Sequence, residues 1–215
     1  MLTHWLFDLD GTLTNSESGI LNSVRYALEK MNREIPAPKP LHSFIGPPLL
    51  RSFTTVCGMS RPEALRAIDL YREYYHEQGV FACTVYEGIP ELLGALVQSG
   101  ATLALATCKP TFYAQKILKH FDLARYFSLV SGPELDGTRG EKREVIAYAI
   151  ERLGCDPTET VMVGDHRDDM LGAKQNGLTG FGALWGFGTE EELRTAGAAR
   201  IYRTPRELQS DLPIR

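Results

Sequence analysis

The segment HWLFDLDGT, residues 4–12, is the strongest indication of the fold in this sequence. The apolar run His4–Leu9 stops at Asp10-Gly11-Thr12, which predicts a short buried strand that enters a loop. Further strands are expected at Thr102–Ala106, Phe127–Val130, Val161–Val163 and, as the last one, Thr179–Ala183, and helices at Ile89–Gln98, Thr111–His120, Arg143–Leu153 and Asp169–Asn176. This alternation predicts an α/β fold with a Rossmann-like, doubly wound parallel sheet. Ligands of such sheets bind at the carboxyl ends of the strands.

A block without strand patterns interrupts this alternation between Ser16 and about Val80. Apolar residues at helical spacing predict a helix over Glu17–Met31. The proline-rich segment Ile35–Pro40 is expected to break any helix. Two more helical stretches are expected around Pro48–Val56 and Pro62–Gln78. We therefore expect an α/β core domain made of residues 1–15 and 81–215, and an inserted helical domain of residues 16–80.

Composition limits the class of protein. The chain has 215 residues, 43% hydrophobic and 23% charged, with a net charge of −4, which indicates a globular protein. No basic block suggests a nucleic-acid or polybasic membrane partner. No apolar stretch approaches the length of a membrane span, and the N-terminus does not resemble a signal peptide. The four cysteines are scattered, without metal-site spacing, as in reduced cytoplasmic proteins. We expect a cytoplasmic location.

Acidic residues follow the first predicted strand. Asp8 and Asp10 flank Leu9 and precede the turn residue Gly11. Two carboxylates and a backbone carbonyl turned toward one point would offer hard oxygen ligands, which suit Mg²⁺. An Asx turn that closes the strand explains the Asp-Gly pair equally well. The segment alone leaves both interpretations open.

Other strand ends carry polar residues with two interpretations each. Thr107 could help to cradle a phosphate at a helix start, or could simply be an N-cap. Asp165 and Asp169 could be oxygen ligands, although acids are also favoured at helix N-termini by the helix dipole. This alternative explains Asp165 less well, because Asp165 directly follows the predicted strand and Gly164. Lys142 is expected in the first turn of a helix, where the dipole disfavours a cation. A buried or anion-facing role would explain it, but a solvated side chain is the commoner outcome.

The order of these features is more specific than any one of them. Asp-x-Asp-Gly-Thr, a helical insert, a threonine after a strand, a lysine and Gly-Asp-x-x-x-Asp together resemble the haloacid dehalogenase superfamily. The four motifs correspond to Phe7–Leu13, Thr107, Lys142 and Gly164–Asp169, and further similarity to its phosphoglycolate-phosphatase-like branch lies at 44–49, 135–139 and 184–188. The insert resembles the small helical cap of that branch.

The resemblance implies catalytic and metal-binding roles. Asp8 would be the nucleophile and form an aspartyl-phosphate. Asp10 would be the general acid and base. Mg²⁺ would be held by the Asp8 carboxylate, the Asp10 backbone carbonyl and Asp165. Asp169 would order metal-bound waters or Lys142 instead of binding the metal directly. An acid at position 10 also argues against carbon–halogen chemistry, because dehalogenases of this superfamily lack it.

The resemblance also implies phosphate- and substrate-binding residues. Thr107, Lys142 and backbone N–H groups at Leu9 and Cys108 would bind the phosphoryl oxygens. In the cap, the loop 44–50 with Gly46 would approach the active site. Arg51 could bind a second anionic group of the substrate, although a surface role on an amphipathic helix explains it slightly better.

Three positions depart from the family pattern. Asn15 stands in the hinge where relatives often carry Asp, and this could alter cap closure without removing the chemistry. Cys108 replaces a more usual Ser or Asn and places a thiol beside the phosphate cradle. His166 follows Asp165 where Ser or Arg is commoner, and we expect it to be exposed and inert.

The sequence therefore predicts a Mg²⁺-dependent phosphatase for small phosphate monoesters, such as phosphoglycolate, a sugar phosphate or a nucleotide. The alternatives are a phosphomutase, an inorganic pyrophosphatase and a non-catalytic module that binds a phosphorylated ligand. A pure binding module would have no use for Asp10. The expected partner is a small phosphorylated molecule, with no nucleic acid and no membrane. The chain could be a monomer or a homodimer.

Overall fold

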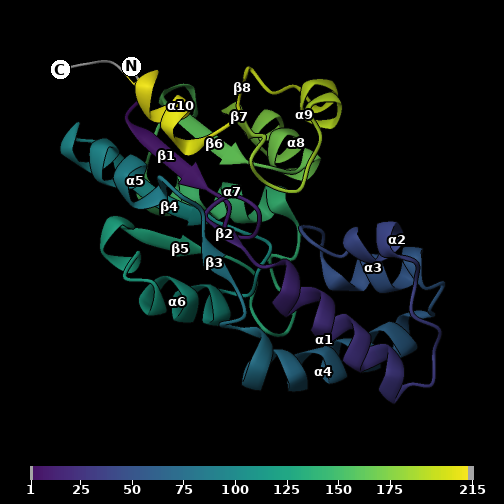
Figure 1. Ribbon diagram of the computed structural model, residues 1–215. Coiled ribbons are helices and arrows are strands. Elements are labelled where there is room, and N and C mark those ends of the chain that lie inside the picture. The colour runs from purple at the N-terminus through teal and green to yellow at the C-terminus, as the bar shows by residue number, and fades with distance from the viewer. Residues whose placement is uncertain (1, 213–215) are drawn as a thin grey trace. The chain divides into compact units, whose positions relative to one another are not determined.

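The chain forms two compact units in the computed structural model, which describes residues 2–212 (Figure 1). Unit 1 comprises residues 1–15 and 85–215, and unit 2 comprises residues 16–84. Short strands β2 (Thr14–Asn15) and β3 (Thr84–Val85) pair where the chain passes between the units. The interpretation of unit 2 as a cap stays a prediction.

Unit 1 contains a six-stranded sheet in the order β5-β4-β1-β6-β7-β8. Its strands are β1 (His4–Phe7), β4 (Thr102–Ala106), β5 (Leu129–Ser131), β6 (Thr160–Gly164), β7 (Thr179–Ala183) and β8 (Arg200–Tyr202). Every neighbouring pair is parallel. The predicted α/β class with a doubly wound parallel sheet is confirmed. The strand order reverses at β1, so the switch point of the sheet lies where the motif of residues 4–12 ends.

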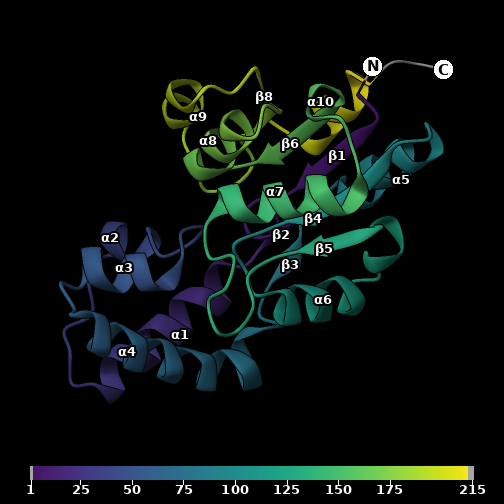
Figure 2. The same ribbon diagram turned by 180° about the vertical axis from the view of Figure 1, so that it is seen from behind.

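Helices cover both faces of this sheet (Figures 1 and 2). They are α5 (Ile89–Gln98), α6 (Thr111–His120), α7 (Lys142–Leu153), α8 (Arg167–Gln175), α9 (Glu190–Ala196) and α10 (Pro205–Ser210), with short 3₁₀ turns η2 (Ala124–Tyr126) and η3 (Pro157–Glu159). On one face, Leu6 and Met162 pack with Ile146 of α7 and Ala173 of α8. On the other, α5 and α10 lie over an aromatic row that includes Phe181, whose ring meets Trp5 and Tyr202 edge to face. Sheet strands buried on both faces explain the continuous apolar runs.

The prediction that Thr179–Ala183 is the last strand was wrong. Strand β8 follows it and pairs with β7, with Phe181 opposite Arg200. It spans three residues at the edge of the sheet, and only Tyr202 of the three is buried. A segment so short and so weakly buried has no readable apolar periodicity.

Unit 2 is helical, with α1 (Glu17–Lys30), α2 (Pro38–His42), α3 (Leu49–Val56), α4 (Arg61–Tyr74) and the π-helical turn η1 (Tyr75–Gly79). The prediction that Ile35–Pro40 breaks any helix was wrong for its last residues, because α2 begins at Pro38. Proline is tolerated in a first turn, where its missing N–H would have no intrahelical partner. No helix within residues 2–212 combines the length and apolar character that a membrane crossing requires.

Candidate active site

The register of the central strands brings three strand ends to one edge of the sheet. Phe7 of β1 lies opposite both Leu105 of β4 and Val163 of β6. The residues that follow these strands therefore emerge side by side. The backbone N–H of Asp8 continues the ladder and donates to the carbonyl of Val163 at 2.9 Å.

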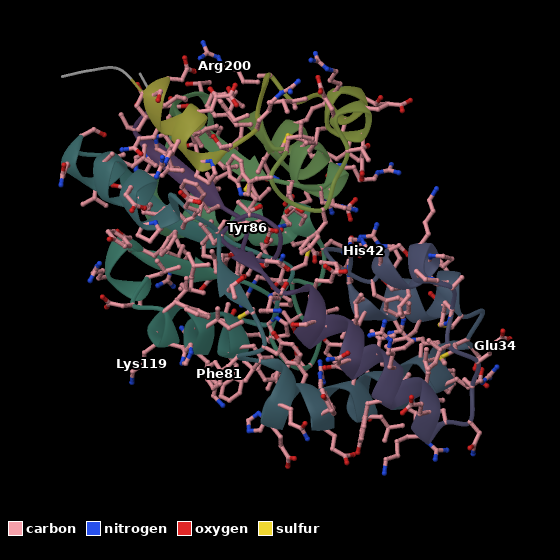
Figure 3. The ribbon with its side chains drawn as sticks, in the orientation of Figure 1. Glu34, His42, Phe81, Tyr86, Lys119 and Arg200 are labelled. Atoms are coloured by element: carbon pink, nitrogen blue, oxygen red, sulfur yellow. The ribbon has the colours of Figure 1, made fainter. Side chains whose placement is uncertain are left out.

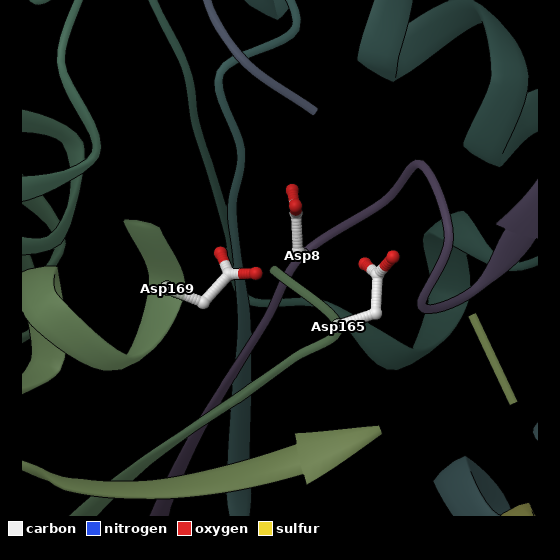
Figure 4. Close-up of side chains that lie close together, drawn as sticks. All are labelled: Asp8, Asp165 and Asp169. Atoms are coloured by element: carbon white, nitrogen blue, oxygen red, sulfur yellow. The ribbon is translucent and has the colours of Figure 1, made fainter. Parts of the chain in front are cut away.

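Three buried carboxylates gather at this edge (Figure 4). Asp8 follows β1, Asp165 follows β6, and Asp169 lies in the first turn of α8. They can each present one oxygen so that all three oxygens lie within 4.8 Å of one another. Their exposed fractions are 4%, 2% and 0%, so the solvent does not screen their mutual repulsion.

Lys142 is the cation of this cluster. It is the first residue of α7 and is buried, so the solvated alternative considered from the sequence is wrong. Its Nζ lies 2.9 Å from Asp8 Oδ1 and 2.7 Å from Asp169 Oδ1, and it donates to the carbonyl of Ala106 at 3.1 Å. Burial by itself would lower the pKa of Lys142, but Asp169 and Asp8 outweigh it and hold the pKa well above its usual value. Lys142 therefore stays charged.

Two carboxyl groups carry raised pKa values. Burial raises the pKa of Asp8, Lys142 offsets part of that rise, and Asp169 adds to it. The pKa of Asp165 is raised well above its usual value, first by burial and then by Asp169 and Asp8. Thr12 Oγ1 and the Phe187 N–H donate to the two oxygens of Asp165 at 3.0 and 2.9 Å. No cation within residues 2–212 forms an ion pair with Asp165, which leaves its charge uncompensated.

The buried charged residues of the site suit the binding of a divalent cation. The buried acids Asp8, Asp10, Asp165 and Asp169 face two buried lysines, Lys109 and Lys142. Buried charges are tolerated when they are paired or coordinate a metal. With every carboxyl group ionised, the acids would exceed the lysines by two charges, and their donor atoms are hard oxygens of the kind that Mg²⁺ and Ca²⁺ prefer. The residues present therefore suit a divalent metal ion.

Asp10 is paired with a residue that the sequence analysis missed. Lys109 Nζ lies 2.7 Å from Asp10 Oδ2, and both residues are buried. Asp10 Oδ1 is buried too and has no hydrogen-bond partner among the described residues. Lysine is almost never fully buried without a partner. Nothing in the local pattern around position 109 signals burial, because its partner lies in the first strand–loop segment.

Thr107 and Cys108 are the first residues of the loop between β4 and α6. Helix α6 begins only at Thr111, so the interpretation of Thr107 as its N-cap is wrong. Thr107 Oγ1 accepts from the Lys109 N–H at 3.2 Å, and a hydrogen bond from the Thr107 side chain lowers the pKa of Asp8. Burial raises the pKa of the Cys108 thiol to about 12, with Lys142 offsetting part of the rise. The thiol beside this loop therefore stays protonated.

A glycine-rich loop after β7 packs against Asp165. A Cβ on Gly186 would lie 2.2 Å from the Gly11 carbonyl and 2.4 Å from Asp165 Cβ, and one on Gly11 (φ +83°) would lie 2.1 Å from Asp165 Oδ2. Trp185 Nε1 donates to the Thr12 carbonyl at 2.9 Å. The family pattern pointed to this loop, but without a role. Close approach of three backbone segments explains its glycines.

The expectation that His166 is exposed was wrong. It is half-buried as the N-cap of α8, and its Nδ1 accepts from the Asp168 N–H at 3.3 Å. In return, Asp169 Oδ2 accepts from the His166 N–H at 2.9 Å. A histidine ring with an acceptor nitrogen can replace the usual capping oxygen. This capping arrangement helps to orient Asp169.

The predicted substrate residues of the helical insert belong to unit 2, not to the unit that holds the cluster. Gly46 lies between α2 and α3 with φ +100°, and Arg51 is exposed on α3. Asn15 ends β2 at the first passage between the units. Contact of Gly46 or Arg51 with a substrate stays a prediction.

Comparison with known proteins adds independent information. Residues 5–183 match the model of the haloacid dehalogenase-like hydrolases. A 5′-nucleotidase of Pseudomonas aeruginosa is 44% identical over 189 residues, which are 88% of this chain and 86% of that protein. The tyrosine-protein kinase PtkA of Mycobacterium tuberculosis is 37% identical over 184 residues, 85% of this chain but 62% of PtkA. The crystal structure of a predicted phosphatase from Clostridium acetobutylicum superposes with a TM-score of 0.95 at 42% identity, covering 99% of this chain and 98% of that one.

Proposed function

This chain belongs to the haloacid dehalogenase-like hydrolase family and is a phosphoric monoester hydrolase, and we propose that it hydrolyses small phosphate monoesters with Mg²⁺ as cofactor and Asp8 as nucleophile. The resemblance found in its motifs is thereby confirmed. The observation that carries the proposal is the placement of Asp8 at the switch point, 2.9 Å from the charged Lys142. The identity to a 5′-nucleotidase favours nucleoside 5′-monophosphates as the first substrates to test.

The first step is transfer of the phosphoryl group to Asp8. An Asp8 carboxylate oxygen attacks phosphorus, and the bond between phosphorus and the leaving oxygen breaks. Asp10, protonated for this step, gives its proton to the leaving oxygen, which departs as an alcohol. The products are an aspartyl-phosphate on Asp8 and an Asp10 carboxylate.

The second step is hydrolysis of the aspartyl-phosphate. The Asp10 carboxylate takes a proton from water while the water oxygen attacks phosphorus. The bond between Asp8 and phosphorus then breaks, which releases inorganic phosphate and restores the Asp8 carboxylate and the protonated Asp10. The unpartnered Asp10 Oδ1 supports this assignment, because a proton-transfer group needs an oxygen that no protein donor occupies.

Charge stabilisation comes from the residues around Asp8. Lys142, the Thr107 hydroxyl and the backbone N–H groups of Leu9 and Cys108 would bind the phosphoryl oxygens. Mg²⁺ would be held by the Asp8 carboxylate, the Asp10 carbonyl and Asp165, and when bound it offsets the repulsion between the nucleophile and the phosphate dianion. Asp169, 2.7 Å from Lys142 Nζ, would orient that lysine. Gly46 and Arg51 stay the proposed substrate contacts of unit 2.

The proposal is tested with a panel of phosphorylated compounds. We expect phosphate release from nucleoside 5′-monophosphates, sugar phosphates or phosphoglycolate with Mg²⁺, and its loss with EDTA. Faster release from pyrophosphate would favour the pyrophosphatase alternative, and turnover only with a sugar bisphosphate would favour a mutase. No release from any compound, with Mg²⁺ bound, would contradict the proposal and favour a binding module. We further propose a cytoplasmic location, which the scattered cysteines favour.

A stability measurement tests the metal site separately, with Asp165→Asn. Because the pKa of Asp165 is raised in the metal-free fold, the folded chain holds a proton that the unfolded chain loses above about pH 4. The contribution of Asp165 to the free energy of unfolding therefore falls as the pH rises from about 4 to 7. Asparagine has no such titration, so metal-free Asp165→Asn gains stability relative to wild type over this range.

Mg²⁺ is expected to shift the difference in stability the other way, in favour of wild type. At about 100 times its dissociation constant it raises the free energy of unfolding of wild type by about 2.7 kcal/mol. Asp165→Asn gains much less, because it lacks one ligand. Urea unfolding with EDTA and with Mg²⁺ at both pH values gives all four comparisons. An equal rise in the free energy of unfolding of both proteins on addition of Mg²⁺ would show that Asp165 is not a metal ligand.

A further inference from the structure

A buried ion pair lies beside the catalytic carboxylates, and the mechanism above leaves one of its members without a role. Lys109 Nζ lies 2.7 Å from Asp10 Oδ2, and the two residues are only 7% and 8% exposed. Asp10 Oδ1 is buried without a hydrogen-bond partner among residues 2–212. The two oxygens of this carboxyl group therefore differ: a cation occupies one, and the other has no protein partner.

The ammonium group of Lys109 influences which of the two Asp10 oxygens can carry a proton. A lysine ammonium has three donors and no acceptor. Asp10 Oδ2 must therefore accept from Lys109 whether the carboxyl group is ionised or protonated. The hydroxyl oxygen of a protonated carboxyl group is a weaker acceptor than its carbonyl oxygen, so an ammonium at Oδ2 favours a proton of Asp10 on Oδ1.

The backbone of Lys109 is held in place. Its N–H donates to Thr107 Oγ1 at 3.2 Å, which ties it to the end of β4. Its carbonyl lies so near Gly132, after β5, that a Cβ there would come within 2.4 Å. These contacts hold the Cα atom of Lys109 in place relative to the sheet. A side chain that positions a catalytic group needs such a fixed backbone.

We propose that Lys109 is a positioning residue that keeps the transferable proton of Asp10 on Oδ1. The inference rests on the proposed function. In the first step the Oδ1 proton moves to the leaving oxygen as its bond to phosphorus breaks. In the second step Oδ1 takes a proton from the attacking water. Lys109 keeps its three protons throughout and touches no reacting atom.

The test compares two leaving groups. An alkyl ester, such as a nucleoside 5′-monophosphate, needs a proton on its leaving oxygen, whereas 4-nitrophenyl phosphate releases a stable anion without one. kcat/KM reports only the steps up to departure of the leaving group, so it isolates the proton donor. For Lys109→Met we expect kcat/KM to fall about 10²-fold for the alkyl ester and less than about tenfold for the aryl ester.

Three companion variants sharpen the test. Lys109→Arg also carries only donors, so it should keep most of the alkyl-ester activity. The glutamine of Lys109→Gln can donate or accept, so this variant should show the same selective loss of kcat/KM on the alkyl ester as Lys109→Met. It replaces Lys109→Met in the test if the methionine variant does not fold. Lys119→Met removes an exposed lysine on α6 (Figure 3) and should leave both activities unchanged. On the alkyl ester, Asp10→Asn/Lys109→Met should be no slower than Asp10→Asn.

The outcomes separate this inference from the proposed function. Equal losses for both esters in Lys109→Met and Lys109→Gln would overturn the inference and give Lys109 a structural or phosphate-binding role. A further loss in the double variant would also overturn it. Hydrolysis of both esters by wild type and of neither by Asp8→Asn would leave the proposed function intact in either case. No hydrolysis of either ester by wild type would overturn both.

Discussion

Replacing Asp8 with asparagine is expected to lower the rate of phosphate release by more than about 10⁴-fold, the scale of loss seen when a catalytic nucleophile is removed. The amide has nearly the shape of the carboxylate, but it is uncharged and a poor nucleophile. No aspartyl-phosphate can then form, so the first step has no acceptor for the phosphoryl group. Release of inorganic phosphate from the best ester of the panel, with Mg²⁺ present, measures the effect.

A matched control and a second measurement make this result specific. Asp122→Asn changes an exposed aspartate at φ +56°, a conformation that asparagine accepts readily, and should leave the rate unchanged. Acid quenching of wild type during turnover should trap phosphate on the protein, and Asp8→Asn should trap none. Phosphate release by Asp8→Asn within tenfold of wild type would assign the nucleophile to another group.

Replacing Lys142 with methionine is expected to damage both catalysis and stability. The phosphoryl oxygens lose a buried charge-assisted donor, which should cost about 10²–10³-fold in kcat. The ammonium also neutralises Asp8 and Asp169, 2.9 and 2.7 Å away. Removing one partner from a buried ionic cluster typically costs about 3–5 kcal/mol. Chemical unfolding with EDTA and steady-state kinetics with Mg²⁺ give the two quantities.

A second substitution tells the two effects apart. In the Lys142→Met background, Asp169→Asn removes one of the stranded buried charges while keeping an oxygen that can accept from the His166 N–H. The double variant should regain part of the lost stability but none of the lost activity. Recovery of activity together with stability would mean that Lys142 acts only by keeping the protein folded.

Much of the fold could be predicted because its signals are local. Strands β4 and β7 and helices α5 and α6 have the bounds that apolar periodicity and turn residues indicated. The weak edge strand β8 could not be found in this way, because only Tyr202 of its three residues is buried. The start of α2 at Pro38 was missed because a proline rule was applied to a first turn, where it does not hold.

Which acids follow which strands can be read from local sequence, and the order of these acids identified the family. That much is a property of neighbours along the chain: Asp8 directly follows β1, and Asp165 directly follows β6. The partners of these acids became visible only in the folded chain. Thr12 donates to Asp165 across 153 positions, Lys142 bridges Asp8 and Asp169, and Lys109 occupies one oxygen of Asp10. Burial and partners of this kind follow from the register of a parallel sheet, whose neighbouring strands are distant in sequence, so no local pattern contains them.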